Sequence, residues 1–205
     1  MPGRFFLTRP LTELADWLGC ALPDLGTQPP RRNIQPGQEV LVLTGQGLCP
    51  MRWGIVPVGR VNARGRPVME TIINARSETV FDKSAFAGTG RAVIPVDGWY
   101  EWTGEKRRKT AWRISDAAGA PLLFAAITDV WTAPGGQQLH QVAAVTCPPN
   151  ADVAPIHHRM GVLLSREDVP VWLNGDQTQV QALMRPWPEG RLRIERATDV
   201  DWSAP

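Results

Sequence analysis

Cysteine, tyrosine and long apolar runs are all scarce in this chain of 205 residues. The three cysteines, Cys20, Cys49 and Cys147, are widely spaced and form no CxxC motif. Such a set argues against a disulfide framework and against a zinc site, so we expect no metal and a reducing compartment. No run of about 18 apolar residues is present, and the first residues lack the charged-then-apolar pattern of a secretory signal. We therefore expect a soluble, cytoplasmic protein with no membrane partner.

Acidic residues are missing from positions 40–69, which contain Arg52, Arg60, Arg64 and Arg66. The formal net charge of the whole chain is only +2, too small by itself to indicate a polyanionic partner. The local excess of arginine is a candidate surface for phosphate groups. A solvated basic loop without a partner explains this feature equally well.

The remaining composition is that of a globular protein, with 43% hydrophobic and 20% charged residues. Nineteen glycines and nineteen prolines indicate many turns and short strands. Nine tryptophans stand against a single tyrosine. Indole rings pack in cores and also stack on planar ligands, and the composition allows both uses. The length fits one domain, which we expect to span residues 1–205.

Apolar spacing predicts an α+β domain made mainly of antiparallel strands, barrel-like, with a few peripheral helices. Leu11–Leu18 has helical spacing and is followed by Gly19, which should end the helix. Residues 21–37 are rich in proline and glycine and are expected to form a loop. Strands are expected at 40–43, 51–56, 91–96, 99–102, 111–114, 122–128, 142–147 and 161–164.

Turn and capping residues divide these predicted elements. Gly45–Gly47 should connect the first two strands, and Asp97–Gly98 is expected to be a tight turn before the strand 99–102. Ser77 is expected to cap a short helix. Ser165 with Asp168 resembles a capping box for a helix through residues 172–173, and one more helix is expected over 180–184.

Glu101 is the first residue that suggests chemistry. Alternation along the strand places Glu101 on the same face as Trp99, with Tyr100 and Trp102 on the other. A carboxyl group beside indole rings is desolvated, which raises its pKa toward the range of a proton-shuttling acid. Taken alone, a glutamate in such a position is more often an exposed strand residue than a functional one.

A second set of candidates lies in loops. Asn74 and Arg76 share one loop, and His157 and His158 precede Arg159. Adjacent histidines on an extended segment cannot both face one site, so we expect at most one to be catalytic. Asn74 is also compatible with a turn residue and Arg76 with a surface charge.

Pro2 adds a possible nucleophile. An initiator methionine is normally removed before a small residue such as proline, which would leave a secondary amine at Pro2. Such an amine attacks aldehydes to give an iminium ion, by the same logic as a lysine Schiff base. The alternative is that Pro2 merely permits trimming.

Taken together, a series of short motifs resembles the SOS-response-associated peptidase (SRAP) family. The resemblance covers about residues 1–172. In order, the motifs are Gly3-Arg4-Phe5, Asn33-x-x-Pro36-Gly37, Trp53-Gly54, Ile73-Asn74-Ala75-Arg76-x-Glu78-Thr79, Asp97-Gly98-Trp99-Tyr100-Glu101-Trp102, Ala125-Ala126-Ile127 and Ile156-His157-x-Arg159-Met160.

The resemblance implies a DNA-repair function in the SOS response. Members of the family recognise abasic sites in single-stranded DNA and join covalently to the ring-opened sugar. They use a cysteine after the initiator methionine, whose amine forms a Schiff base and whose thiol closes a thiazolidine. Pro2 has no thiol, so the resemblance implies at most an iminium crosslink, which would hydrolyse or proceed to β-elimination as in a lyase.

The resemblance also implies roles for individual residues. Asn74 would position the amino terminus and the sugar, Glu101 would move protons, and His157 would assist opening of the sugar ring. His158 replaces the acidic residue usual after that histidine, which would alter the orientation and pKa of His157.

The DNA would be held mainly through its backbone. Arginine side chains match phosphate oxygens with a fork of donors, and many family members carry tryptophans where this chain has the basic stretch 59–66. Binding should therefore be salt-sensitive. The residues expected at the DNA are Gly3, Arg4, Asn33, Pro36, Arg60, Arg64, Arg66, Arg76 and Thr146.

Three functions remain open from the sequence. The first is an abasic-site protein that reacts through Pro2. The second is a non-covalent module that shields damaged single strands, and the third is a peptidase or hydrolase that processes its own amino terminus, as the family name suggests. In each case we expect a monomer without a cofactor, cytoplasmic and associated with the nucleoid when bound to DNA.

Overall fold

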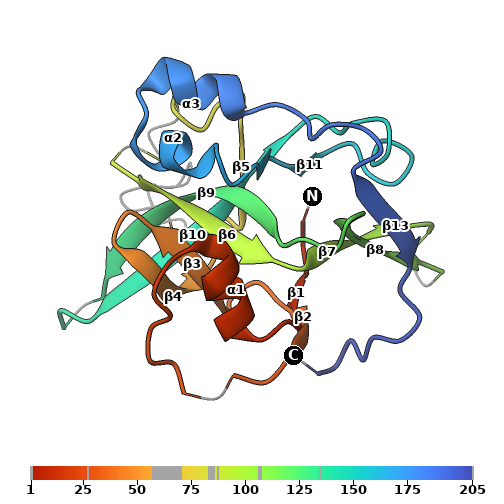
Figure 1. Cartoon of the computed structure of the whole chain (residues 1–205), viewed down its shortest axis with the longest axis horizontal. Coiled ribbons are helices and arrows are strands. Elements are labelled where there is room, and N and C mark those ends of the chain that lie inside the picture. Colours follow the sequence, from red (N-terminus) through yellow and green to blue (C-terminus); the bar gives the residue numbers. More distant parts are fainter. Residues whose placement is uncertain are drawn as a thin grey trace, which may run out of the picture.

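A computed structural model describes residues 2–26, 28–56, 71–82, 86, 88–105, 108–133 and 135–204, and this part of the chain forms two β-sheets with three short helices (Figure 1). The elements are β1 (Phe5–Leu7), α1 (Leu11–Leu18), β2 (Arg31–Ile34), β3 (Glu39–Thr44), β4 (Gly47–Trp53), β5 (Asn74–Arg76), β6 (Gly90–Val96), β7 (Gly98–Thr103), β8 (Thr110–Asp116), β9 (Leu122–Thr132), β10 (Gln138–Cys147), β11 (Met160–Gly161), β12 (Leu163–Leu164), α2 (Val169–Asn174), α3 (Gln177–Leu183) and β13 (Leu192–Arg196).

The larger sheet closes into a barrel. Its strands follow the order β11-β10-β4-β3-β6-β9-β12, and β9 also pairs with β10, so that β10, β4, β3, β6 and β9 form a ring. Most of these pairs are antiparallel, whereas β10 runs parallel to β4 and to β5. Long runs of fully buried aliphatic side chains on β6, β9 and β10 fill the interior. The α+β, mainly antiparallel and barrel-like fold expected from the sequence is confirmed.

The smaller sheet has the order β13-β8-β7-β1-β2 and carries the amino-terminal strand. Phe5 of β1 closes the barrel core, where its ring stacks on Trp53 at 4.2 Å between centroids and meets Phe124 edge-on at 5.0 Å. Trp99 of β7 packs on the same Phe124 ring at 5.4 Å. The two sheets therefore share one aromatic junction beside the start of the chain.

The chain passes from the large sheet to the small one at Asp97. The tight turn expected at Asp97–Gly98 is a bend, and the strands on its two sides pair with different partners, β6 with β3 and β9, and β7 with β1 and β8. A side chain at position 98 would place its Cβ 2.1 Å from the carbonyl oxygen of Ile114 and 2.6 Å from the Phe6 ring. Glycine is therefore required for the sheets to approach this closely.

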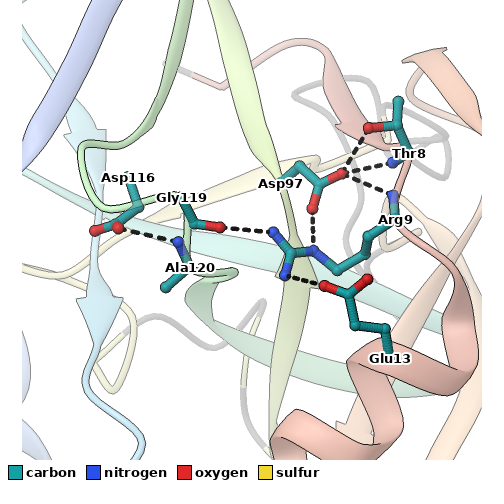
Figure 2. Close-up of polar contacts among 7 residues, drawn as sticks. All are labelled: Thr8, Arg9, Glu13, Asp97, Asp116, Gly119 and Ala120. Carbon is teal, nitrogen blue, oxygen red and sulfur yellow. Dashed lines mark hydrogen bonds and ion pairs between the residues drawn. The ribbon is translucent and has the colours of Figure 1, made fainter.

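Asp97 fastens this bend to the end of β1 (Figure 2). Its carboxylate accepts hydrogen bonds from the Thr8 backbone N–H at 2.6 Å, the Thr8 hydroxyl at 2.9 Å and the Arg9 backbone N–H at 3.1 Å, and it pairs with the Arg9 guanidinium. Burial acts to raise the pKa of Asp97, but the donors of Arg9 and Thr8 hold that pKa below its ordinary value. The ionised carboxylate thus fixes where β1 lies against β7.

Helices α1, α2 and α3 agree with the sequence prediction, but one of their capping interactions differs from it. Helix α1 has the predicted bounds and ends at Gly19, whose φ of 69° is left-handed. Ser165 and Asp168 bond to each other in the turn before α2, but the capping box of α3 is formed by Asp176 and Gln179, which the sequence pattern did not predict. Among the described residues, no helix has both the length and the apolar character needed to cross a bilayer.

Several predicted segments are corrected by the structure. Ser77 begins a series of turns rather than a helix, because its backbone N–H donates to the Thr146 carbonyl of β10 at 2.8 Å. The expected loop 21–37 contains β2, which pairs with β1. The strand predicted at 161–164 is divided at Val162 into β11 and β12, which pair with different strands, and β13 was not predicted.

Candidate active site

The amino-terminal segment runs antiparallel to β7 and reaches Glu101. Phe5 pairs with Trp99 and Phe6 with Gly98, and the Tyr100 N–H donates to the Arg4 carbonyl at 3.0 Å. Continuing this register toward the amino terminus places Gly3 opposite Glu101. Figure 1 shows the start of β1 directed toward the part of the molecule that holds β5.

Asn74 holds the backbone of Pro2. It lies at the start of β5, opposite Ala144 of β10, and its Nδ2 donates to the Pro2 carbonyl at 2.8 Å. Pro2 is buried. The Asn74 Oδ1 atom is also buried and has no hydrogen-bond partner among the described residues, so the amide presents an available acceptor next to Pro2.

Glu101 is a buried carboxyl group, with 3% of its surface exposed. As the alternation predicted, it lies on the opposite face of β7 from Tyr100 and Trp102, which form a separate cluster with Phe6. Desolvation raises the pKa of Glu101 above its ordinary value, and the positive charge of the amino terminus only partly opposes this rise. Glu101 therefore retains a proton more readily than an exposed glutamate, which suits proton transfer.

The charge of the amino terminus acts on His157 as it does on Glu101, and the protonated form of the His157 ring is disfavoured. The Arg159 backbone N–H donates to its Nδ1 at 3.0 Å, and its ring stacks on His158 at 4.3 Å between centroids. Burial, followed by the charge of the amino terminus, lowers the pKa of His157 to about 4. Near neutral pH the ring is therefore uncharged.

A half-buried ion pair connects the histidine turn to β5 and β10. The Arg159 guanidinium binds both carboxylate oxygens of Glu78, with Nη2 at 2.8 Å from Oε2, and it donates to the Thr146 carbonyl at 2.5 Å. Glu78 and Arg159 each belong to one of the short motifs listed above, but the sequence analysis assigned no role to either. Their opposite charges, in two separate motifs, were the signal that could have indicated an ion pair.

The predicted DNA-contacting residues do not all share one surface. Arg76 follows Asn74 on β5 and is exposed, whereas Thr146 is fully buried and Gly3 and Arg4 are half-buried. Asn33 is fully buried, and its Nδ2 donates to the carbonyls of Trp202 at 3.1 Å and Ala204 at 2.7 Å.

The remaining predicted contacts lie elsewhere in the chain. Pro36 is half-buried in the turn between β2 and β3. Arg60, Arg64 and Arg66 lie outside the described residues. In the part of the chain that the structure describes, no group of three or more His, Cys, Asp or Glu side chains is arranged to hold a metal ion.

These features define a class: a β-barrel protein whose amino-terminal strand pairs with the strand that carries a buried glutamate of raised pKa, and whose amino-terminal charge acts on a histidine of lowered pKa. The chain belongs to the SOS response associated peptidase (SRAP) family, whose profile it matches over residues 1–200.

Named relatives and solved structures agree with this membership. The chain is 30% identical over 200 residues to the abasic site processing protein YoqW of Bacillus subtilis, covering 91% of this chain and 88% of YoqW. It is 31% identical over 150 residues to the abasic site processing protein YedK of Escherichia coli, covering 70% of this chain and 64% of YedK. A crystal structure of a Bacteroides thetaiotaomicron protein superposes with a TM-score of 0.83 at 19% identity, over 96% of this chain and 92% of that protein, which shows the shared fold.

Proposed function

We propose that this protein binds abasic sites in single-stranded DNA and engages the ring-opened sugar aldehyde through the amine of Pro2, exposed by removal of Met1. The observation that carries the proposal is the hydrogen bond from Asn74 Nδ2 to the Pro2 carbonyl. It is supported by the register of β1 on β7, which continues to Gly3 opposite the buried Glu101. Relatives named as abasic site processing proteins support the choice of substrate.

The proposed reaction begins with the free amine of Pro2. Its nitrogen forms a bond to the sugar C1′ carbonyl carbon as the C=O π bond breaks. The nitrogen then loses its proton to solvent, and the oxygen takes up a proton from solvent to become a hydroxyl. Protonated Glu101 then gives its proton to that hydroxyl, which leaves as water and produces an iminium ion. The raised pKa of Glu101 favours the acid form that this step needs.

The iminium ion can react further in two ways. Pro2 takes the place of the thiol-bearing residue of the family and offers no second nucleophile that could close a ring. Water can add back, which releases the aldehyde and the free amine. Alternatively, the Glu101 carboxylate removes a proton from C2′, and the electron pair of that C–H bond expels the 3′ phosphate as the C3′–O bond breaks. Hydrolysis makes the protein a reversible crosslinker, whereas β-elimination makes it a lyase.

We propose that arginines hold the DNA backbone on either side of the sugar. Arg76 is exposed at the end of the strand that begins with Asn74, and Arg4 is half-buried next to the amino terminus. Each phosphate that is neutralised releases counterions, so log Kd should change linearly with log salt, with a slope of about 0.7 per contact on single strands.

The experiment uses single-stranded DNA with one abasic site, with and without borohydride. Borohydride adds hydride to the iminium carbon and so converts a transient adduct into a stable amine. We expect an adduct on a denaturing gel only with borohydride, and strand cleavage without it. Intact-mass measurement first establishes that Met1 is absent.

Two controls separate chemistry from binding. A form whose amino terminus is acetylated should give no adduct yet still bind the DNA, and E101Q should form the adduct more slowly. A lack of adduct in the wild-type protein, together with tight binding to the abasic strand, would overturn the covalent proposal and leave a non-covalent shield. Recovery of an adduct by Pro2→Cys would then show that the rest of the site is intact.

A further inference from the structure

We propose that Glu78 and Arg159 are positioning residues that keep the proton of neutral His157 on Nε2, so that His157 acts on the substrate as a hydrogen-bond donor and not as a base. This inference rests on the proposed function for its substrate. The placement of the proton is a property of the protein alone.

The proton assignment follows from the backbone around Nδ1. The Arg159 N–H points at His157 Nδ1 at 3.0 Å, and a backbone N–H can only donate. A proton on Nδ1 would therefore face another proton. The Arg159 carbonyl oxygen also lies 3.2 Å from Nδ1, but accepting from Nδ1 would require this N–H to lose its acceptor. In the neutral ring the Nδ1 lone pair is used, and the proton is on Nε2.

This arrangement depends on where the Arg159 peptide is held. Arg159 is 8% exposed, and its guanidinium binds Glu78 through both terminal nitrogens. The same group donates to the Thr146 carbonyl at 2.5 Å, on the strand that pairs with β5. One side chain thus connects three segments, and a two-point contact with a carboxylate fixes direction as well as distance.

A hydrogen-bond donor at Nε2 suits opening of the sugar ring. When the closed sugar opens to the aldehyde, the C1′ hydroxyl loses its proton to solvent and its oxygen becomes the carbonyl oxygen. At the same time the bond between C1′ and the ring oxygen breaks, and negative charge develops on the ring oxygen. The His157 Nε2–H can stabilise this charge by a hydrogen bond, while solvent supplies the proton that completes the hydroxyl. A ring with its lone pair on Nε2 would instead repel the same oxygen.

The placement of the proton is tested by NMR on the free protein labelled with ¹⁵N-histidine. The chain has three histidines, and H157Q identifies the pair of ring signals that belongs to His157. We expect a non-protonated Nδ1 and a protonated Nε2 at pH 7. Protonated Nδ1 in the wild-type protein would overturn the inference.

The role of the ion pair is tested by E78A and by E78Q, which preserves side-chain size in case E78A does not fold. Both should convert the His157 signals into an exchanging mixture of the two tautomers. The matched control is E195Q, since Glu195 pairs with Arg113 and has a side chain 49% exposed, against 48% for Glu78. Unchanged His157 signals in a folded E78A or E78Q protein would overturn the role of Glu78.

A kinetic measurement completes the test. The rate of borohydride-trapped adduct formation should fall about tenfold to a hundredfold in E78Q, with Kd for the undamaged strand unchanged. A fall in affinity with no change in rate would overturn the positioning role. If the wild-type protein forms no adduct, the proposed function fails, while the NMR result still decides where the proton lies.

Discussion

At the scale of single residues, the environment of Glu101 shows how one strand separates two chemical settings. The alternation along β7 directs Trp99 and Glu101 to the barrel side and Tyr100 to the outer cluster. The carboxyl group therefore lies at the junction of the two sheets, where water is excluded. The positive charge of the amino terminus acts on this carboxyl group and partly opposes the effect of its burial.

The first prediction concerns E101Q. The raised pKa of Glu101 in the folded state means that the native protein binds this proton more tightly than the unfolded chain does. The free energy of unfolding therefore falls as the pH rises above 4.5, the ordinary pKa of this carboxyl group. Replacing it with a neutral amide should stabilise the protein at pH 7 by about 0.5–2 kcal/mol. Thermal unfolding at pH 7 and pH 4 measures this effect, which should vanish at the lower pH. A destabilised E101Q at pH 7 would contradict it.

The second prediction concerns acid stability through Glu78. The Arg159 hydrogen bonds lower the pKa of Glu78 to about 2, from 4.5. As the pH falls, Glu78 is therefore protonated in the unfolded chain before it is protonated in the folded protein. The stabilisation of the folded protein by ionised Glu78 is fully present above pH 4.5 and is lost as the pH falls toward 2. Because 48% of the Glu78 side chain is exposed, solvent screening limits the effect to about 1 kcal/mol or less.

Urea unfolding of the wild-type protein and E78Q between pH 6 and pH 2.5 measures this difference. The stability gap between them should be largest at pH 6 and close as the pH falls. E195Q serves as the control, since it removes a carboxylate of similar exposure from another arginine pair. A difference in unfolding free energy between wild type and E78Q that stays constant with pH would contradict a stabilising Glu78–Arg159 ion pair.

At the scale of elements, the position of β1 is decided by the bend between β6 and β7. Asp97 binds the end of β1, and Gly98 lets β8 and Phe6 approach the bend closely. Both contacts act on the strand that carries the amino terminus. The geometry at Pro2 therefore depends on residues nearly one hundred positions away in the sequence.

The third prediction is that G98A is strongly destabilising. A Cβ 2.1 Å from the Ile114 carbonyl cannot be accommodated without separating β7 from β8. We expect a loss of about 2 kcal/mol or more in unfolding free energy. G45A is the matched control, because a Cβ there meets nothing within 4 Å. Equal unfolding midpoints for G98A and G45A would contradict the close approach of the strands.

At the scale of the whole molecule, the carboxy-terminal segment covers the outer face of the small sheet. Trp202 packs edge-on against Tyr100 at 5.0 Å and Trp102 at 5.3 Å. Asn33 holds the same segment through two backbone carbonyls. The aromatic face opposite Glu101 is thus partly enclosed by residues from the far end of the chain.

The fourth prediction distinguishes this role of Asn33 from the DNA contact expected from the sequence. N33A should lose about 1–3 kcal/mol of unfolding free energy, because the carbonyls of Trp202 and Ala204 lose their buried donor. The affinity of the folded protein for abasic DNA should not change. N174A, which removes an exposed amide bonded to Pro170, is the control for stability. Weaker DNA binding with unaltered stability would instead support a contact between Asn33 and DNA.

Much of the fold was determined by the sequence alone. Periodic apolar residues predicted α1, most strands and the face of β7 that carries Glu101, because local spacing decides which side of an element is buried. The residue types that suggest chemistry, Pro2 and His157 among them, were also visible. The order of the short motifs along the chain was sufficient to indicate the family.

Tertiary structure decided which of these residues meet. The bond between Asn74 and Pro2, the contacts of Asn33 with the chain end, and the separation of β6 and β7 into two sheets all join segments distant in sequence. Such pairings depend on strand register and on the closure of the barrel through β9 and β10, which local spacing does not encode. The sequence therefore determined the elements and their chemically active residues, whereas long-range packing decided the arrangement around the amino terminus.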